Sequence, residues 1–169
     1  MALTAERLRE IVHYNPETGE FRWRHDHRCG NNRIHRPAGS SAGTTNKNGY
    51  RQIHIDGKNY YGHRLAWLHV HNGWPVGEID HINGNRADNR IENLREATRS
   101  QNSMNSGARS DNRFGMRGVS VITRRGKYEA NIKIDGKRIC IGKYDTPEAA
   151  NAAYQARAAQ LFGTFRRAP

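Results

Sequence analysis

The segment from His63 to Asn102 carries, in order, His63-Arg64-Leu65-Ala66-Trp67, Glu78-Ile79-Asp80-His81-Ile82-Asn83-Gly84-Asn85, Asn93-Leu94 and Ser100-Gln101-Asn102. Apolar residues alternate with polar ones up to Asp80 and His81, a turn-rich stretch of Gly and Asn follows, and a helix start comes after it. This order predicts a strand, a loop and a helix. A carboxylate beside an imidazole, joined later by a helix-borne Asn, can hold one hard divalent cation next to a general base.

These motifs resemble the ββα-metal (His-Me finger) active site of HNH endonucleases, in the variant in which Asn replaces the final His. The resemblance implies that Asp80 binds the metal and that His81 is the general base. It implies that Asn93 orients the base and ties the loop, and that Asn102 is the second metal ligand. The implied cofactor is one Mg²⁺ or Mn²⁺ per active site, because an amide oxygen suits a hard ion.

His63 and Arg64 precede this site in the pattern that the subfamily commonly has. Arg64 could contact a DNA phosphate, and it could equally be a structural ion-pair partner.

The charge of the chain predicts a nucleic-acid partner. Lys and Arg number 28 against 16 Asp and Glu, which gives a net charge of +12 over 169 residues. Phosphate neutralisation by such an excess supplies sequence-independent affinity for DNA. No apolar run approaches the ~18 residues that a membrane span needs, so we expect no membrane. The N-terminal residues have no signal-peptide pattern, which predicts a cytoplasmic protein.

Ahead of the central segment, residues 4–14 have helical spacing of Leu8, Ile11 and Val12 behind a possible Thr4 cap. Residues 20–24 then alternate like a strand. His25, His27 and Cys29 could be metal ligands, but three such residues without a second cluster are more often loop residues. A DNA-contacting loop is the stronger reading of this region, with Arg28, Arg33 and Arg36 as its basic residues. Cys29 and Cys140 form no CxxC pair, so neither a zinc knuckle nor a disulfide framework is indicated.

A hairpin is predicted from Tyr50 to His63, because Asp56-Gly57 suits a tight turn between two alternating segments. A short helix through Leu65 and Val70 should follow and end near Asn72-Gly73. A strand from Val76 to His81 then leads to the site. Thr98-Arg99-Ser100-Gln101 matches a capping box, so a helix should begin at Thr98.

The polar segment 106–113 is rich in Gly, Ser and Asn and predicts a linker between domains 1–105 and 114–169. The second domain should have three antiparallel strands and one packed helix. Val119 and Val121 lie on the first strand, and the alternation from Tyr128 to Ile134 gives the second. Asp135-Gly136 turns the chain into the third strand, and Thr146-Pro147-Glu148 begins the helix. The predicted fold class is therefore α+β.

Short motifs of this second domain resemble an APETALA2-type DNA-binding domain: Arg117-Gly118-Val119, Ile141-Gly142-Lys143-Tyr144, Thr146-Pro147-Glu148-Ala149-Ala150 and Ala153-Tyr154. In that family the sheet lies in the major groove of duplex DNA. Carried over by position, the candidate DNA-binding residues are Arg117, Arg124, Arg125, Lys127, Lys133 and Arg138. Members often have a Trp in the sheet and this domain has none, so its base preference cannot be inherited. Residues 113–169 hold 12 Lys and Arg against 4 Asp and Glu, while every His lies at or before His81.

The sequence thus predicts a phage-type, homing or free-standing HNH endonuclease that cuts double-stranded DNA in a bacterial host. It predicts a monomer without a small-molecule cofactor. The rival hypothesis is a sequence-specific DNA-binding regulator that carries an inactive HNH domain. Intact Asp80, His81 and Asn102 argue against this rival.

Overall fold

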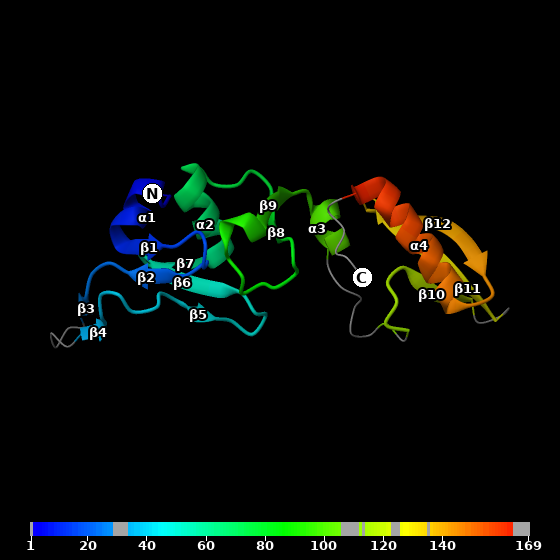
Figure 1. The fold of residues 1–169 in the computed structure, drawn as a ribbon, viewed down its shortest axis with the longest axis horizontal. Coiled ribbons are helices and arrows are strands. Elements are labelled where there is room, and N and C mark those ends of the chain that lie inside the picture. Colours follow the sequence, from blue (N-terminus) through cyan, green and yellow to red (C-terminus); the bar gives the residue numbers. More distant parts are fainter. Residues whose placement is uncertain are drawn as a thin grey trace. The chain divides into compact units, whose positions relative to one another are not determined.

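The chain is α+β, as predicted, and divides into two compact units, Met1–Glu96 and Ala97–Pro169, each of which is described by itself. The computed structural model describes residues 2–28, 34–105, 112, 114–122, 126–134 and 136–163 (Figure 1). The predicted linker lies almost wholly outside these residues. The predicted domain 1–105 includes the helix at 99–105, which here belongs to the second unit.

The first unit begins with helix α1 (Ala5–Ile11), whose first turn is capped by the Thr4 hydroxyl accepting from Arg7 N at 3.2 Å. Strand β1 (Val12–Tyr14) follows and pairs antiparallel with β2 (Phe21–Trp23). The predicted helix over 4–14 was therefore wrong for its last turn. Val12 and Tyr14 are buried while His13 is exposed, and this two-residue period belongs to a strand.

Two short strands, β3 (His27–Arg28) and β4 (Ile34–Arg36), form the next antiparallel pair. Cys29 and Arg33, which belong to the two readings of this loop, lie outside the described residues. Strands β5 (Thr44–Thr45), β6 (Arg51–Ile55) and β7 (Lys58–Tyr61) form a sheet in that order. The predicted hairpin is confirmed: Asp56 and Gly57 have φ angles of 47° and 79° and join β6 to β7.

Helix α2 (Gly62–His71) ends at Asn72, whose left-handed φ of 59° closes the helix, close to the predicted stop. It starts at Gly62, so the last two residues of the predicted hairpin are helical. Leu65 and Leu68 on its inner face join Leu8, Phe21 and Ile53 in the core of the first unit.

Strand β8 (Glu78–His81), the 3₁₀ turn η1 (Ile91–Asn93) and strand β9 (Leu94–Ala97) come next, and β8 pairs with β9. Helix α3 (Arg99–Asn105) follows them in the chain. Its predicted capping box is present: Thr98 N donates to Gln101 Oε1 at 2.8 Å, and Gln101 N donates to Thr98 Oγ1 at 3.2 Å. Strand β9 was not predicted, because four residues at Leu94–Ala97 give too short an alternation to separate from a loop.

The second unit has strands β10 (Val119–Ile122), β11 (Lys127–Ile134) and β12 (Lys137–Tyr144) in an antiparallel sheet, with helix α4 (Pro147–Phe162) packed on one face. Thr146 caps α4 by accepting from Ala149 N at 3.2 Å, as predicted. The small core between helix and sheet consists of Ala130, Ile132, Ala150, Tyr154 and Ala158. None of the helices within the described residues combines the length and apolarity of a membrane span.

Candidate active site and DNA-binding face

Strand β8 ends on the two residues predicted to carry the chemistry. Asp80 is 3% exposed, its Oδ2 accepts a hydrogen bond from Nε of Arg95 on β9 at 2.9 Å, and Arg95 Nη2 lies 2.8 Å from the same oxygen in an ion pair. A buried carboxylate needs such a partner, because desolvation of an isolated charge costs several kcal/mol. The pairing of β8 with β9 therefore fixes the orientation of the Asp80 carboxylate.

His81, 5% exposed, lies beside Asp80 on the same strand. Its Nε2 is 3.5 Å from Oδ1 of Asn89, a buried residue of the following loop. Burial lowers the pKa of His81, while the hydrogen bond to Asn89 and the nearby carboxylates of Asp80 and Asp88 act in the opposite direction. The imidazole is consequently neutral near pH 7, which is the form that a general base requires.

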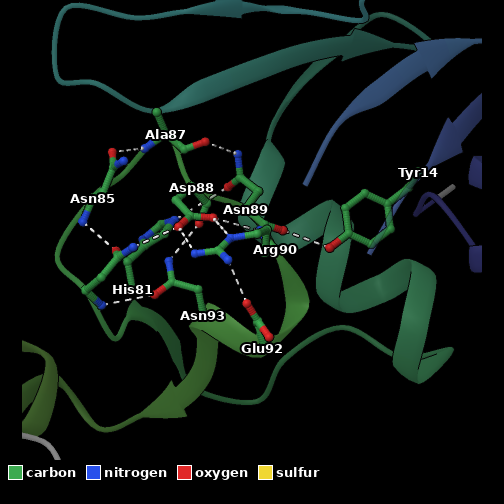
Figure 2. Close-up of polar contacts among 10 residues, drawn as sticks. Tyr14, His81, Asn85, Ala87, Asp88, Asn89, Arg90, Glu92 and Asn93 are labelled. Atoms are coloured by element: carbon green, nitrogen blue, oxygen red, sulfur yellow. Dashed lines mark hydrogen bonds and ion pairs between the residues drawn. The ribbon is translucent and has the colours of Figure 1, made fainter. Parts of the chain in front are cut away.

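The loop between His81 and β9 is held by side-chain amides (Figure 2). Asn93 Oδ1 accepts from Asn83 N at 3.0 Å, and Asn93 Nδ2 donates to the Asp88 carbonyl at 2.9 Å. The Ile82 N–H also donates to the Asn93 carbonyl at 2.9 Å. The amide of Asn93 thus bridges both ends of the loop, while the amide that faces the His81 ring is that of Asn89 (Figure 2).

An ion pair stiffens the same loop. Arg90 contacts Asp88 through Nε (2.9 Å) and Nη2 (2.8 Å), and its Nη1 reaches Glu92 at 2.7 Å. The Arg90 guanidinium, helped by the amide of Asn83, lowers the pKa of Asp88 to about 2. Asp88 is therefore ionised at every working pH, and its charge stays beside the base.

A second imidazole, that of His63 at the start of α2, packs edge-on against His81 with ring centroids 5.1 Å apart. Tyr61 stacks on the His63 ring at 5.5 Å, and Tyr50 lies 5.3 Å from it. Burial, with smaller contributions from His81 and Arg64, lowers the pKa of His63 to about 3. His63 is neutral near pH 7 and therefore adds no positive charge beside the base.

The donor chemistry at Asp80 fits a magnesium-type ion. Mg²⁺ is held by one or two protein oxygens together with water and substrate phosphates, whereas Zn²⁺ needs three or four protein ligands. No group of three or more His, Cys, Asp and Glu that could hold a metal occurs among the residues described. The single buried carboxylate of Asp80 matches the first pattern. Asp80 is described with the first unit and Asn102, on α3, with the second, so their pairing at one ion stays a prediction.

The predicted DNA-binding residues of the second unit comprise three on strands, one before β10 and two outside the described residues. Lys127 and Lys133 alternate with the core residues of β11 and so project from the face opposite α4. Arg138 on β12 is directly across from Lys133, and its Nη2 donates to Ser120 Oγ at 3.0 Å. Lys127 also forms an ion pair with Asp145.

Arg117 differs from these strand residues, because its guanidinium donates to the carbonyl of Ser103 on α3. Arg124 and Arg125 lie outside the described residues. In the first unit, Arg64 donates to the Gly77 carbonyl at 3.4 Å and lies over the Trp74 ring at 5.8 Å. Arg36 lies over the Trp23 ring at 5.2 Å.

Two residues of the site were missed by sequence reasoning. Arg95 lies on β9, a strand that was not predicted. Asn89 is one of several Asn residues in a turn-rich loop, and composition alone does not distinguish it from the others. The only available signal for Asn89 was its place next to Asp88, two residues before the apolar anchor Ile91.

Along the chain, a strand that ends on a buried carboxylate and imidazole is followed by a loop, a strand and a helix, which is the element order of a ββα-type nuclease. A sequence model described as HNH endonuclease matches residues 60–104, which include every predicted catalytic and metal-binding residue. Protein 3.8 of Escherichia phage T7 is 30% identical over 106 residues, covering 62% of this chain and 87% of the phage protein. This chain belongs to the HNH endonuclease family, a family of DNA phosphodiester hydrolases.

A second relative is an uncharacterized HNH endonuclease of Acanthamoeba polyphaga mimivirus. It is 34% identical over 105 residues, which cover 61% of this chain and 54% of the relative. Both relatives are viral proteins.

Proposed function

We propose that this chain is a phage-type, homing-like endonuclease that hydrolyses phosphodiester bonds of double-stranded DNA at a recognised site. The observation that carries the proposal is the buried, neutral imidazole of His81 at the end of β8, beside the buried carboxylate of Asp80. A neutral imidazole can accept a proton from water at neutral pH.

In the proposed reaction His81 removes a proton from the attacking water. The water oxygen forms a bond to phosphorus as the bond from phosphorus to the 3′ oxygen breaks, in line with the attack. The leaving oxygen takes its proton from solvent. Asp80 and Asn102 would hold one Mg²⁺ or Mn²⁺, which would stabilise the negative charge on the scissile phosphate and the leaving oxygen. Asn93 holds the loop that follows His81 through the hydrogen bonds of its side-chain amide to Asn83 N and the Asp88 carbonyl.

In this proposal the second unit binds DNA. The sheet face opposite α4 lies in the major groove, as the APETALA2-type resemblance implies. Lys133 and Arg138 are adjacent on that face, and Arg138 is 62% exposed. Lys127 lies on the same face of β11 as Lys133, and Arg64, Arg117, Arg124 and Arg125 remain candidate contacts. Basic residues here give salt-dependent affinity, and any that reaches a base edge adds site preference.

Selection of cleaved products from a randomised duplex library tests this function and identifies the target site together. We expect cut molecules with a shared sequence in Mg²⁺ or Mn²⁺ and none in EDTA. Sequence-selective binding without cutting in either metal would favour the inactive regulator instead. Equal cutting with and without EDTA would contradict the metal-dependent mechanism.

A further inference from the structure

The turn between β1 and β2 braces the loop that carries Asn89. The Tyr14 hydroxyl donates to the Asn89 carbonyl at 2.8 Å (Figure 2). Ile91 N donates to the Pro16 carbonyl at 3.0 Å. Gly19 packs so closely that a Cβ atom there would lie 2.6 Å from Arg90 N and 2.7 Å from the carbonyl carbon of Asn89. The backbone at residues 89–91 is therefore fixed by the N-terminal hairpin, a segment that precedes the matched family region.

The side chain of Asn89 is fixed as well. It is 1% exposed, and its Nδ2 donates to the Ala87 carbonyl at 3.1 Å. Gly62, the first residue of α2, lies against the same nitrogen, since a Cβ there would be 3.3 Å from Nδ2. With the amide nitrogen engaged on that side, the amide oxygen Oδ1 is the atom turned toward His81 Nε2 at 3.5 Å.

An amide oxygen can only accept a hydrogen bond, and a neutral imidazole carries its proton on one of its two nitrogens. We propose that Asn89 is a positioning residue that holds His81 in the tautomer with the proton on Nε2 and the lone pair on Nδ1. Nδ1 is then the atom that removes the proton from water. When it does so, the Asn89 oxygen still accepts from Nε2 and stabilises the imidazolium that forms.

This inference rests on the proposed function for its consequence, but its structural content can be measured without any DNA. The test is ¹⁵N–¹H correlation NMR of the His81 ring in the full-length protein at pH 8, where the imidazole is neutral. Signals of His81 are identified by their loss in His81→Gln. We expect one tautomer with the proton on Nε2. A proton on Nδ1, or an even mixture, would overturn the proposal whether or not the protein cuts DNA.

Two variants separate positioning from packing. Asn89→Leu has a similar size and no acceptor, so it should give mixed tautomers and a loss in kcat of about tenfold to a hundredfold at unchanged KM. Asn89→Asp keeps an acceptor and should retain the Nε2 proton. A folded Asn89→Leu with wild-type tautomer and kcat would overturn the proposal. Should this variant fail to fold, the wild-type spectrum decides.

Discussion

The buried polar groups around His81 differ in whether a partner compensates their burial, and the consequences of a substitution differ from residue to residue. His63 has no charged partner to favour its protonated form, and its Nδ1 has no hydrogen-bond partner among the described residues. Asp80 depends on Arg95, whose side chain is 17% exposed. These two residues lead to predictions about stability that do not require the DNA target.

His63 should make the first unit sensitive to acid. Its pKa is about 3 in the folded protein against an ordinary 6.5, so below pH 6.5 the unfolded chain takes up a proton that the folded protein refuses. This contribution to stability is complete above pH 6.5 and is lost as the pH falls toward 3, by about 1.4 kcal/mol per pH unit. Urea unfolding at pH 7 and pH 5 should show a smaller loss in His63→Gln than in the wild type.

His54→Gln, at an exposed position on β6, is the control for removal of any histidine. Equal pH dependence of the wild type and His63→Gln would contradict the neutral, buried state of His63.

Arg95→Met should leave the Asp80 carboxylate buried without its cation and should lower the free energy of unfolding by about 3 kcal/mol. Arg22→Met is the matched control, because its pair with Glu20 is more than half exposed and should be worth at most about 1 kcal/mol. If Asp80 binds a divalent ion, Mg²⁺ should raise the melting temperature of Arg95→Met more than that of the wild type. If Arg95→Met and Arg22→Met lower the free energy of unfolding equally, the buried ion pair contributes no more to stability than the exposed one.

At the scale of elements, local signals predicted the hairpin turn at Asp56-Gly57 and the helix caps at Thr4, Thr98 and Thr146. Each of these depends on residues that are neighbours in sequence, so the sequence alone carries the information. Strands β1 and β9 escaped prediction because each has only three or four residues, and tertiary pairing rather than propensity makes them strands.

The candidate site follows the same division. The motif predicted Asp80 and His81 at the end of one strand, and both residues lie at the end of β8. The partners Arg95 and Asn89 approach from elements whose positions depend on the folded loop, and no sequence spacing specifies them. The pairing of Asp80 with Asn102 remains a prediction.

The contact between β10 and α4 in the second unit depends on a glycine. Gly118 has a φ of 76°, and a Cβ there would lie 2.1 Å from the Tyr154 ring. Gly118→Ala should therefore destabilise the second unit by about 1–3 kcal/mol through overpacking. Gly115→Ala, with φ of 61° and no atom within 4 Å, is the control for the backbone strain alone. Differential scanning calorimetry of both variants checks this, and equal melting temperatures would rule out the close approach.

At the scale of the whole molecule, the proposed general base lies in the first unit and the proposed DNA-binding face in the second, and residues 113–169 hold 12 Lys and Arg against 4 Asp and Glu. Lys133→Ala with Arg138→Ala should lower affinity for the selected site and reduce the slope of log affinity against log salt by about 1.8, or 0.9 per lost phosphate contact. Arg157→Ala is the control, because it removes one charge from α4, on the other side of the sheet. A titration at two or more salt concentrations measures both. An unchanged slope in the double variant would show that this sheet face does not hold DNA.

The most direct test of the account is the single-turnover cleavage rate of the selected duplex by wild type and His81→Ala, each at saturating enzyme with Mg²⁺ and with EDTA. The account predicts metal-dependent cutting by the wild type, a rate about 10²–10⁴-fold lower in His81→Ala, and equal DNA affinity for the two proteins. A His81→Ala protein that is folded, binds DNA as the wild type does and cuts at the wild-type rate would contradict it.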